Sequence, residues 1–208
     1  MSEQAIADID LTALISSRIC HDVISPVGAI SNGLEVLSDE TDAEMREHAM
    51  ELIVKSAAQA SAKLQFARLA FGAAGSAGAE IDLRDAEKVS RDFVKGKHEL
   101  TWTGPLATLP KNKVKLLLNL ISLGVVALPR GGTLDVHIDD QASRFEIRGK
   151  GQAAGLKDEM KALLSADGAT DGLDAHSIQP YFARRLAESI GMSISVENRP
   201  EEVVLVAS

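Results

Sequence analysis

Apolar residues recur every three or four positions along most of the first 72 residues, which is the spacing of one face of an α-helix. They form two stretches that flank the polar segment 38–42. The apolar face of the first stretch consists of Ile15, Ile19, Val23, Pro26, Ile30, Leu34 and Leu37. That of the second consists of Met45, Ala49, Leu52, Ser56, Ala60, Leu64, Ala67 and Phe71. The pattern predicts two long amphipathic helices.

The segment between these helices is so short that they must run antiparallel, as a hairpin. Asp42 suits the N-cap of the second helix, and Glu44 complements the dipole of its first turn. The apolar face of the second helix contains several alanines, whose small side chains allow helix backbones to approach closely. Because two helices cannot cover both apolar stripes, we expect two chains to pair in a C2 dimer with a four-helix bundle. The alternative is that the stripe packs on the chain's own C-terminal domain.

Small residues over 72–79 separate this helical part from the rest of the chain. Glycine and small side chains leave the backbone free, as in a linker. Beyond them, short β-type runs alternate with helical segments, which indicates an α/β arrangement. We therefore expect a hairpin domain over residues 1–72, a linker over 73–80 and a second domain over 81–208, so that the whole chain is α+β.

In the second domain the pattern predicts a mixed sheet with helices on one face. The helices are expected at 83–94, 111–126, 157–164 and 179–190. The strands are expected at 99–102, 133–138, 144–148, 193–197 and 203–206.

Composition narrows the class of protein. The chain has 208 residues, of which 45% are hydrophobic and 25% charged, and its mean hydropathy is +0.03, as in a soluble protein of one or two domains. No run approaches the roughly 20 apolar residues of a membrane-spanning helix, and the N-terminus does not resemble a secretory signal, so we expect a cytoplasmic protein. The single cysteine, Cys20, excludes an intrachain disulfide and a Cys-rich zinc site.

A net charge of −8 argues against nucleic-acid binding. The charge is uneven, because residues 1–72 contain 5 Lys and Arg against 11 Asp and Glu. This asymmetry is equally compatible with a solvated acidic face and with a functional surface.

Among the polar residues of the first helix, His21 lies opposite the apolar face when each residue is rotated by about 100°. The residues on its side are mostly small or polar: Leu14, Ser17, Arg18, Ser25, Gly28 and Asn32. We expect the imidazole to stand in water, where another protein can reach it. The alternative is an ordinary solvated histidine.

An exposed imidazole is a competent nucleophile toward phosphorus, and histidine changes charge near neutral pH. Asp22 can orient the ring or take up its proton. Ser25 and Arg18 lie one turn away on either side, where they can donate hydrogen bonds to phosphoryl oxygens, with charge assistance from Arg18. A Ser-Pro pair by itself can also mark only a kink.

The segment 17–37 resembles the phosphoacceptor helix of two-component histidine kinases. The shared pattern is a histidine, an acidic residue, two spacers, a hydroxyl residue and a proline, which here are His21, Asp22, Ser25 and Pro26. Residues 18–37 are more closely similar to the ChpT-type histidine phosphotransferases of alphaproteobacteria, and the two-domain layout extends this similarity over nearly the whole chain. The resemblance implies a homodimeric helical hairpin followed by a degenerate histidine-kinase ATPase-like domain.

The nucleotide motifs of such kinases are incomplete in this chain. Asn119 is retained, but Leu123 stands at the Mg²⁺-binding position and cannot coordinate a hard cation. Gly151 is retained, but Gly149 or Arg148 stands where the adenine-reading aspartate is expected. The glycine-rich phosphate loop is replaced by 174–180, which contains no glycine. We therefore expect no nucleotide, metal or other cofactor of its own, with Mg²⁺ supplied by a partner.

The resemblance implies an enzyme, a histidine phosphotransferase, that passes a phosphoryl group between receiver-domain aspartates through His21 without autokinase activity. A receiver supplies its own Mg²⁺, phosphoaspartate and lysine, so the transferase need only present an imidazole in line with phosphorus. The implied donor is the receiver domain of a CckA-like hybrid histidine kinase, and the implied acceptors are CtrA-like and CpdR-like response regulators. The expected docking surface consists of Leu14, Ser17, Gly28 and Asn32, with Ile24 and Val27 at its edge.

Two alternatives stay open at this point: an ATP-dependent histidine kinase and a non-catalytic dimeric adaptor. The remaining histidines show no metal-ligand spacing and are interpreted as surface or packing residues: His48, His98, His137 and His176. Cys20 is interpreted as a small packing residue.

Overall fold

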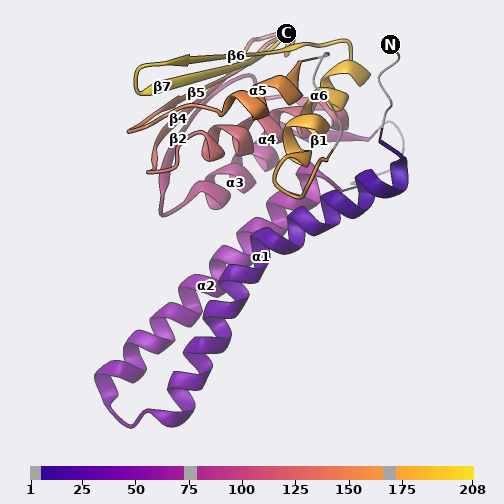
Figure 1. Ribbon diagram of the computed structural model, residues 1–208. Helices are drawn as coiled ribbons and strands as arrows, with labels where there is room; N and C mark the ends of the chain where they lie inside the picture. The colour runs from indigo at the N-terminus through magenta and orange to yellow at the C-terminus, as the bar shows by residue number, and fades with distance from the viewer. Residues whose placement is uncertain (1–5, 73–78, 166–171) are drawn as a thin grey trace.

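The first two helices form an antiparallel hairpin. The computed structural model describes residues 6–72, 79–165 and 172–208. Helix α1 (Asp8–Asp39) and helix α2 (Ala43–Ala70) pack along each other, and three residues join them. Figure 1 shows the hairpin extending from beneath the C-terminal domain. The predicted helical hairpin is confirmed.

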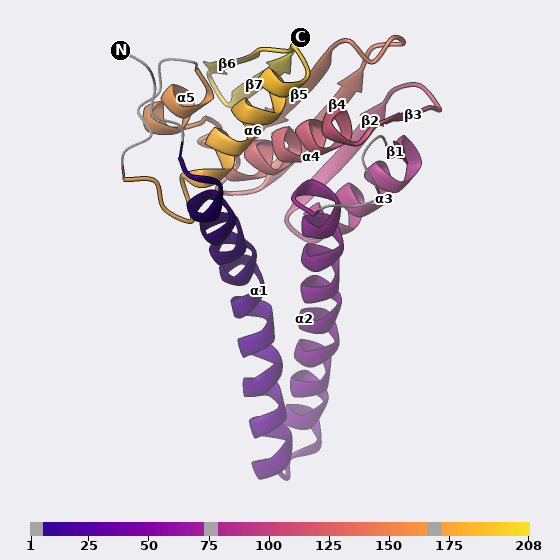
Figure 2. The ribbon, with the colours of Figure 1, turned by 90° about the vertical axis from the view of Figure 1, so that its right-hand side faces the viewer.

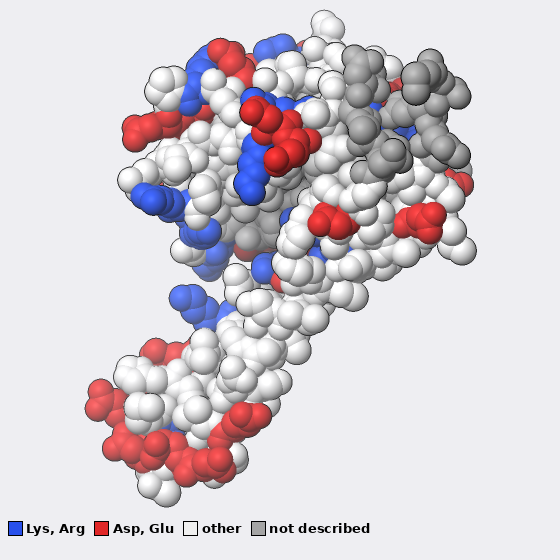
Figure 3. Space-filling model, viewed as in Figure 1, with Lys and Arg blue, Asp and Glu red and all other residues white. Residues whose placement is uncertain are grey.

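The hairpin turn is held by hydrogen bonds that its sequence provides. Asp42 is the N-cap of α2, as predicted, and its carboxylate accepts the backbone N–H groups of Glu44 and Met45 at 3.0 Å. The Glu40 carboxylate accepts the N–H groups of Asp42 and Thr41, and these bonds lower the pKa of Glu40 below its usual value. Acidic residues gather around this turn, where Figure 3 shows them at the tip of the hairpin.

Small side chains allow the two helices to approach closely. Gly33 of α1 is buried, and a Cβ added there would lie 2.6 Å from Cγ1 of Ile53 on α2. The α2 residues buried in the hairpin are small: Ala49, Ser56 and Ala60. Larger members of the predicted stripes remain about half exposed in the single chain: Leu34, Met45, Leu52 and Leu64. The hairpin therefore buries only part of its apolar surface.

The C-terminal domain contains a five-stranded mixed sheet in the order β2-β4-β5-β7-β6. Its strands are β2 (His98–Thr103), β4 (Gly132–Ile138), β5 (Phe145–Lys150), β6 (Ile194–Arg199) and β7 (Glu202–Ala207). β2 and β4 are parallel, and the other neighbouring pairs are antiparallel. Figure 1 shows the helices of the domain on one face of this sheet: α3 (Leu83–Val94), α4 (Lys111–Val126), α5 (Asp158–Leu164) and α6 (Ile178–Ser189). Each of these predicted elements is confirmed to within two residues at its ends.

Two strands were not predicted. β1 (Glu80–Asp82) and β3 (Thr108–Pro110) form a separate antiparallel pair. With three residues each, they are too short to show an alternating pattern. β1 begins within the range expected for the linker, and the rest of that linker, 73–78, lies outside the described residues.

The core of the domain lies between the sheet and α4. Leu117, Leu120 and Leu123 of α4 are fully buried, as are the strand residues Leu134 and Ile147. The opposite face of the sheet is polar and carries ion pairs such as Arg148–Glu146 at 2.7 Å. A sheet with one packed face and one solvated face gives this alternation of apolar and polar residues.

The end of α2 is anchored in the C-terminal domain. The ring of Phe66 stacks on that of Phe93 of α3, with centroids 4.0 Å apart, and Asn119 of α4 donates a hydrogen bond to the Ala70 carbonyl at 3.1 Å. Figure 2 shows α1 and α2 separating toward this domain, α1 toward α6 and α2 toward α3. At the end of the predicted stripe Phe71 packs on the domain core, and Ala67 lines a small cavity together with Phe93 of α3.

Among the helices of residues 6–72, 79–165 and 172–208, none has an apolar stretch sufficient to span a lipid bilayer.

Candidate functional site

His21 lies on the surface of α1, close to where the C-terminal domain begins to cover the hairpin. Its side chain is 57% exposed, as the helical pattern predicted. Nδ1 lies 3.6 Å from Oδ1 of Asp22, which is slightly longer than a hydrogen bond. Nδ1 is therefore the ring nitrogen that faces this carboxylate.

Asp22 is itself held by a neighbour one helical turn away. Nε of Arg18 donates a hydrogen bond to Oδ2 of Asp22 at 3.0 Å, and only 12% of the Arg18 side chain is exposed. The structure therefore brings Arg18 to the carboxylate beside His21. Ser25, the other predicted phosphoryl contact, is exposed on the next turn of α1.

A proline and a lysine fix the backbone of α1 at the same place. Pro26 has no N–H, so the helical hydrogen bond that the Asp22 carbonyl would otherwise accept is missing. Lys63 of α2 replaces it, because its Nζ donates to that carbonyl at 2.7 Å. The proline of the phosphoacceptor pattern is thus compensated by a charged residue on the facing helix.

Replacing Lys63 with methionine tests this contact, since methionine keeps the apolar stem and removes the donor. We expect the Lys63→Met chain to lose about 1–2 kcal/mol of unfolding free energy, because the partly buried Asp22 carbonyl is left unpaired. Chemical denaturation measures the loss. Lys55→Met, at an exposed position of α2, is the matched control and should leave the stability unchanged. Equal stability of the two variants would contradict the role given to Lys63.

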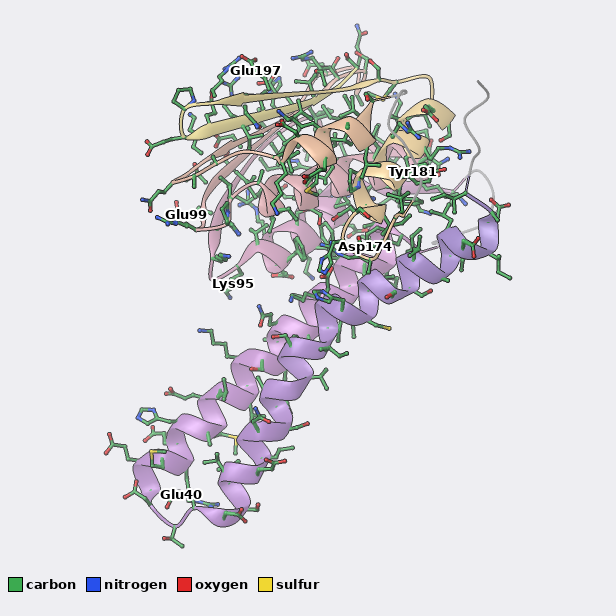
Figure 4. The ribbon with its side chains drawn as sticks, in the orientation of Figure 1. Glu40, Lys95, Glu99, Asp174, Tyr181 and Glu197 are labelled. Carbon is green, nitrogen blue, oxygen red and sulfur yellow. The ribbon has the colours of Figure 1, made fainter. Side chains whose placement is uncertain are left out.

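The C-terminal domain also contributes a residue beside His21, and sequence reasoning missed it. The ring of His176 packs edge-to-face against that of His21, with centroids 4.7 Å apart and planes at 79°. His176 lies just before α6, where Figure 4 labels Asp174 next to α1. A cavity of about 690 Å³ lies between the two domains here, lined by both histidines and by Arg18. The interpretation of His176 as a surface or packing residue agrees with its exposed position, but no local pattern could have paired it with His21.

Around His21 the remaining surface of α1 is open. Ser17, Gly28 and Asn32 are exposed, Leu14 is half-buried, and a Cβ added at Gly28 would meet no atom within 4 Å. At the predicted edge of this surface Ile24 is 70% exposed and Val27 47% exposed. Cys20 is exposed as well, so its interpretation as a packing residue is wrong.

The chain is similar to known proteins along nearly its whole length. The family model described as "Histidine phosphotransferase C-terminal domain" matches residues 83–202. Protein phosphotransferase ChpT of Brucella abortus (strain 2308) is 50% identical to this chain over 205 residues, which cover 97% of each protein. The chain belongs to the histidine phosphotransferase family. A solved structure of a bacterial phosphotransferase is similar along the same length, with a TM-score of 0.89, 46% identity and 98% of each chain covered.

In this phosphotransferase the residues at the expected nucleotide-motif positions make other contacts. Leu123 is fully buried in the core, and the Asn119 amide donates to the carbonyls of Ala70 and Lys115. Gly149 and Arg148 belong to β5, where Arg148 pairs with Glu146 on the polar face of the sheet. These residues do not fit a Mg²⁺–nucleotide complex. Within the described ranges no three His, Cys, Asp or Glu side chains are grouped so that they could hold a metal ion.

Proposed function

We propose that this phosphotransferase carries phosphoryl groups between the aspartates of receiver domains, with His21 as the phosphoacceptor. The observation that carries the proposal is an exposed imidazole whose Nδ1 faces a carboxylate, in a chain that is 50% identical to a protein named a phosphotransferase. In this assignment Asp22 orients the ring, and Arg18 holds Asp22 in place.

The chemistry requires little from the protein beyond this geometry. Nε2 of His21 attacks phosphorus of an aspartyl phosphate, the bond from phosphorus to the aspartate oxygen breaks, and the aspartate leaves as a carboxylate with the electron pair. Nδ1 keeps its proton, and the nearby Asp22 carboxylate stabilises the positive charge that develops on the ring. Attack by a second receiver's aspartate on the same phosphorus reverses these steps. The receiver provides Mg²⁺, so the phosphotransferase needs no metal or nucleotide of its own.

The open surface of α1 suits a receiver as partner. Exposed small and apolar side chains continue along α1 from His21, including Ile24, Val27 and Gly28, so a receiver can approach from this side. By resemblance we expect a CckA-like hybrid kinase receiver as donor and CtrA-like and CpdR-like regulators as acceptors, all in the cytoplasm.

The deciding experiment supplies a phosphoryl group without ATP. A receiver carrying labelled phosphoaspartate is purified away from nucleotide and mixed with the phosphotransferase. We expect acid-labile, base-stable label on the phosphotransferase, followed by its transfer to a second receiver. In a parallel sample, labelled ATP alone should leave the chain unlabelled. Labelling by ATP alone would favour a kinase, and no label from the receiver would contradict the proposal.

We also propose that two chains pair through the hairpin to form a four-helix bundle. A groove of about 440 Å³ runs between α1 and α2 and is lined by Ile15, Ile19, Leu64 and Phe71, all members of the predicted apolar stripes. Leu64 is 50% exposed in the single chain. A second hairpin would remove this apolar surface from water, which is the main driving force of association.

Replacing Leu64 with glutamate tests the pairing. We expect Leu64→Glu to convert the dimer to a monomer, because a charge would replace an apolar side chain worth roughly 2 kcal/mol in each chain. Light-scattering mass in solution is the measurement. Lys55→Glu places the same charge on the opposite side of α2, nine residues away, and should remain dimeric. A native chain that is monomeric at micromolar concentration would contradict the proposed dimer.

A further inference from the structure

We propose that His176 is a positioning residue for phosphotransfer: its ring, supplied by the C-terminal domain, restricts the orientation of the His21 ring so that Nε2 faces the docked receiver. This inference rests on the proposed role of His21 as phosphoacceptor. The carrying observation is the edge-to-face contact of the two rings at 4.7 Å, between residues of different domains.

His21 has little else to hold its ring. Its side chain is 57% exposed, and its nearest charged partner, Oδ1 of Asp22, is at 3.6 Å, just beyond hydrogen-bond length. An exposed side chain of this kind changes rotamer on the picosecond to nanosecond scale. Transfer to phosphorus requires a nitrogen lone pair aligned with the breaking bond, and misplacement by about 1 Å can cost two orders of magnitude in rate. A second contact that limits ring rotation therefore acts directly on the transfer step.

His176 is well placed to provide that contact because its backbone is fixed. The Asp174 carboxylate accepts the backbone N–H of His176 at 2.9 Å and that of Ser177 at 2.8 Å, and it also accepts the Ser177 hydroxyl at 2.7 Å. Bonds from Ser177 lower the pKa of Asp174, so the carboxylate stays charged and keeps accepting. These bonds hold the His176 backbone in a turn that leads directly into α6.

A direct docking contact with the receiver is the competing explanation for any effect of His176, and kinetics separate the two. A docking contact changes the receiver concentration at half-saturation. A positioning residue changes the maximal single-turnover rate and leaves the receiver concentration at half-saturation unchanged. Phenylalanine keeps a planar ring for edge-to-face packing and removes both nitrogens, whereas alanine removes the ring.

The experiment measures single-turnover transfer from a phosphorylated receiver to the native chain, His176→Ala, His176→Phe and the control His137→Ala. His137 is an exposed histidine on β4 of the same domain. We expect His176→Ala to lower the maximal rate by about tenfold or more. The receiver concentration at half-saturation should stay within about twofold of that of the native chain. His176→Phe should recover most of the rate, and His137→Ala should match the native chain. An unchanged rate in His176→Ala, a change confined to half-saturation, or equal slowing by phenylalanine and alanine would each overturn the proposal.

A second measurement does not depend on transfer. Nitrogen NMR of the unphosphorylated protein reports the two neutral tautomers of the His21 ring. We expect the form with hydrogen on Nδ1, which faces Asp22, to be the main one in the native chain and in His176→Phe, and to decrease in His176→Ala. Identical His21 spectra in all three would overturn the positioning role. If the tautomer changes but the native chain accepts no phosphoryl group, the proposed function fails and the ring contact stands.

Discussion

Replacing His21 with alanine is expected to abolish phosphoryl transfer between receivers and leave the fold intact. In the proposed mechanism the His21 imidazole itself forms the covalent bond to phosphorus, and alanine has no nitrogen that could replace it. Because the His21 side chain is more than half exposed, its removal should change the unfolding free energy by less than about 0.5 kcal/mol. Labelled phosphate passing from one receiver to another, with the phosphotransferase present in catalytic amount, is the quantity to measure.

The matched control for this prediction is His48→Ala. His48 is an exposed histidine on α2 that lies 3.8 Å from Glu44 and 4.0 Å from Glu51, near the acidic tip of the hairpin. The His48→Ala variant should transfer the phosphoryl group at the native rate. If His21→Ala still moved label between receivers, the chain would be an adaptor that brings receivers together, and the covalent role of His21 would be wrong.

Replacing Gly33 with leucine is expected to disrupt the hairpin. A Cβ at this position would lie 2.6 Å from Cγ1 of Ile53 and 3.3 Å from the Ala49 carbonyl oxygen, so a full leucine side chain has no space between the helices. Overpacking of this kind costs about 3 kcal/mol, and it should also lower the helical content of residues 8–70. Thermal and denaturant unfolding followed by circular dichroism measures the loss.

The same substitution at Gly28, five residues earlier in α1, should have the opposite effect on stability. A Cβ at Gly28 meets no atom within 4 Å, and leucine favours a helix over glycine by about 0.8 kcal/mol. Gly28→Leu should therefore fold at least as stably as the native chain. It lies on the proposed docking surface, so transfer from the receiver should slow. Equal stability of the two leucine variants would show that the helices do not pack as described.

The elements of this fold were largely predictable because their signals are local. A helix with one apolar face reveals itself through residues three and four positions apart, and the Asp42 cap acts on N–H groups two and three residues away. The exposure of His21 followed from the same rotation along a single helix. The two short strands β1 and β3 were missed because three residues are too few to show a period.

Local sequence patterns account for the helical hairpin, the alternating second domain and the exposure of His21. Packing of the two domains sets what surrounds that histidine: Lys63 on the Asp22 carbonyl and His176 against the ring. It also decided that the Asn119 amide binds the end of α2, a contact that leaves no trace in the local pattern. The physical reason is that periodicity and capping record interactions within a few residues, whereas these contacts join side chains that are close only after the two domains have packed.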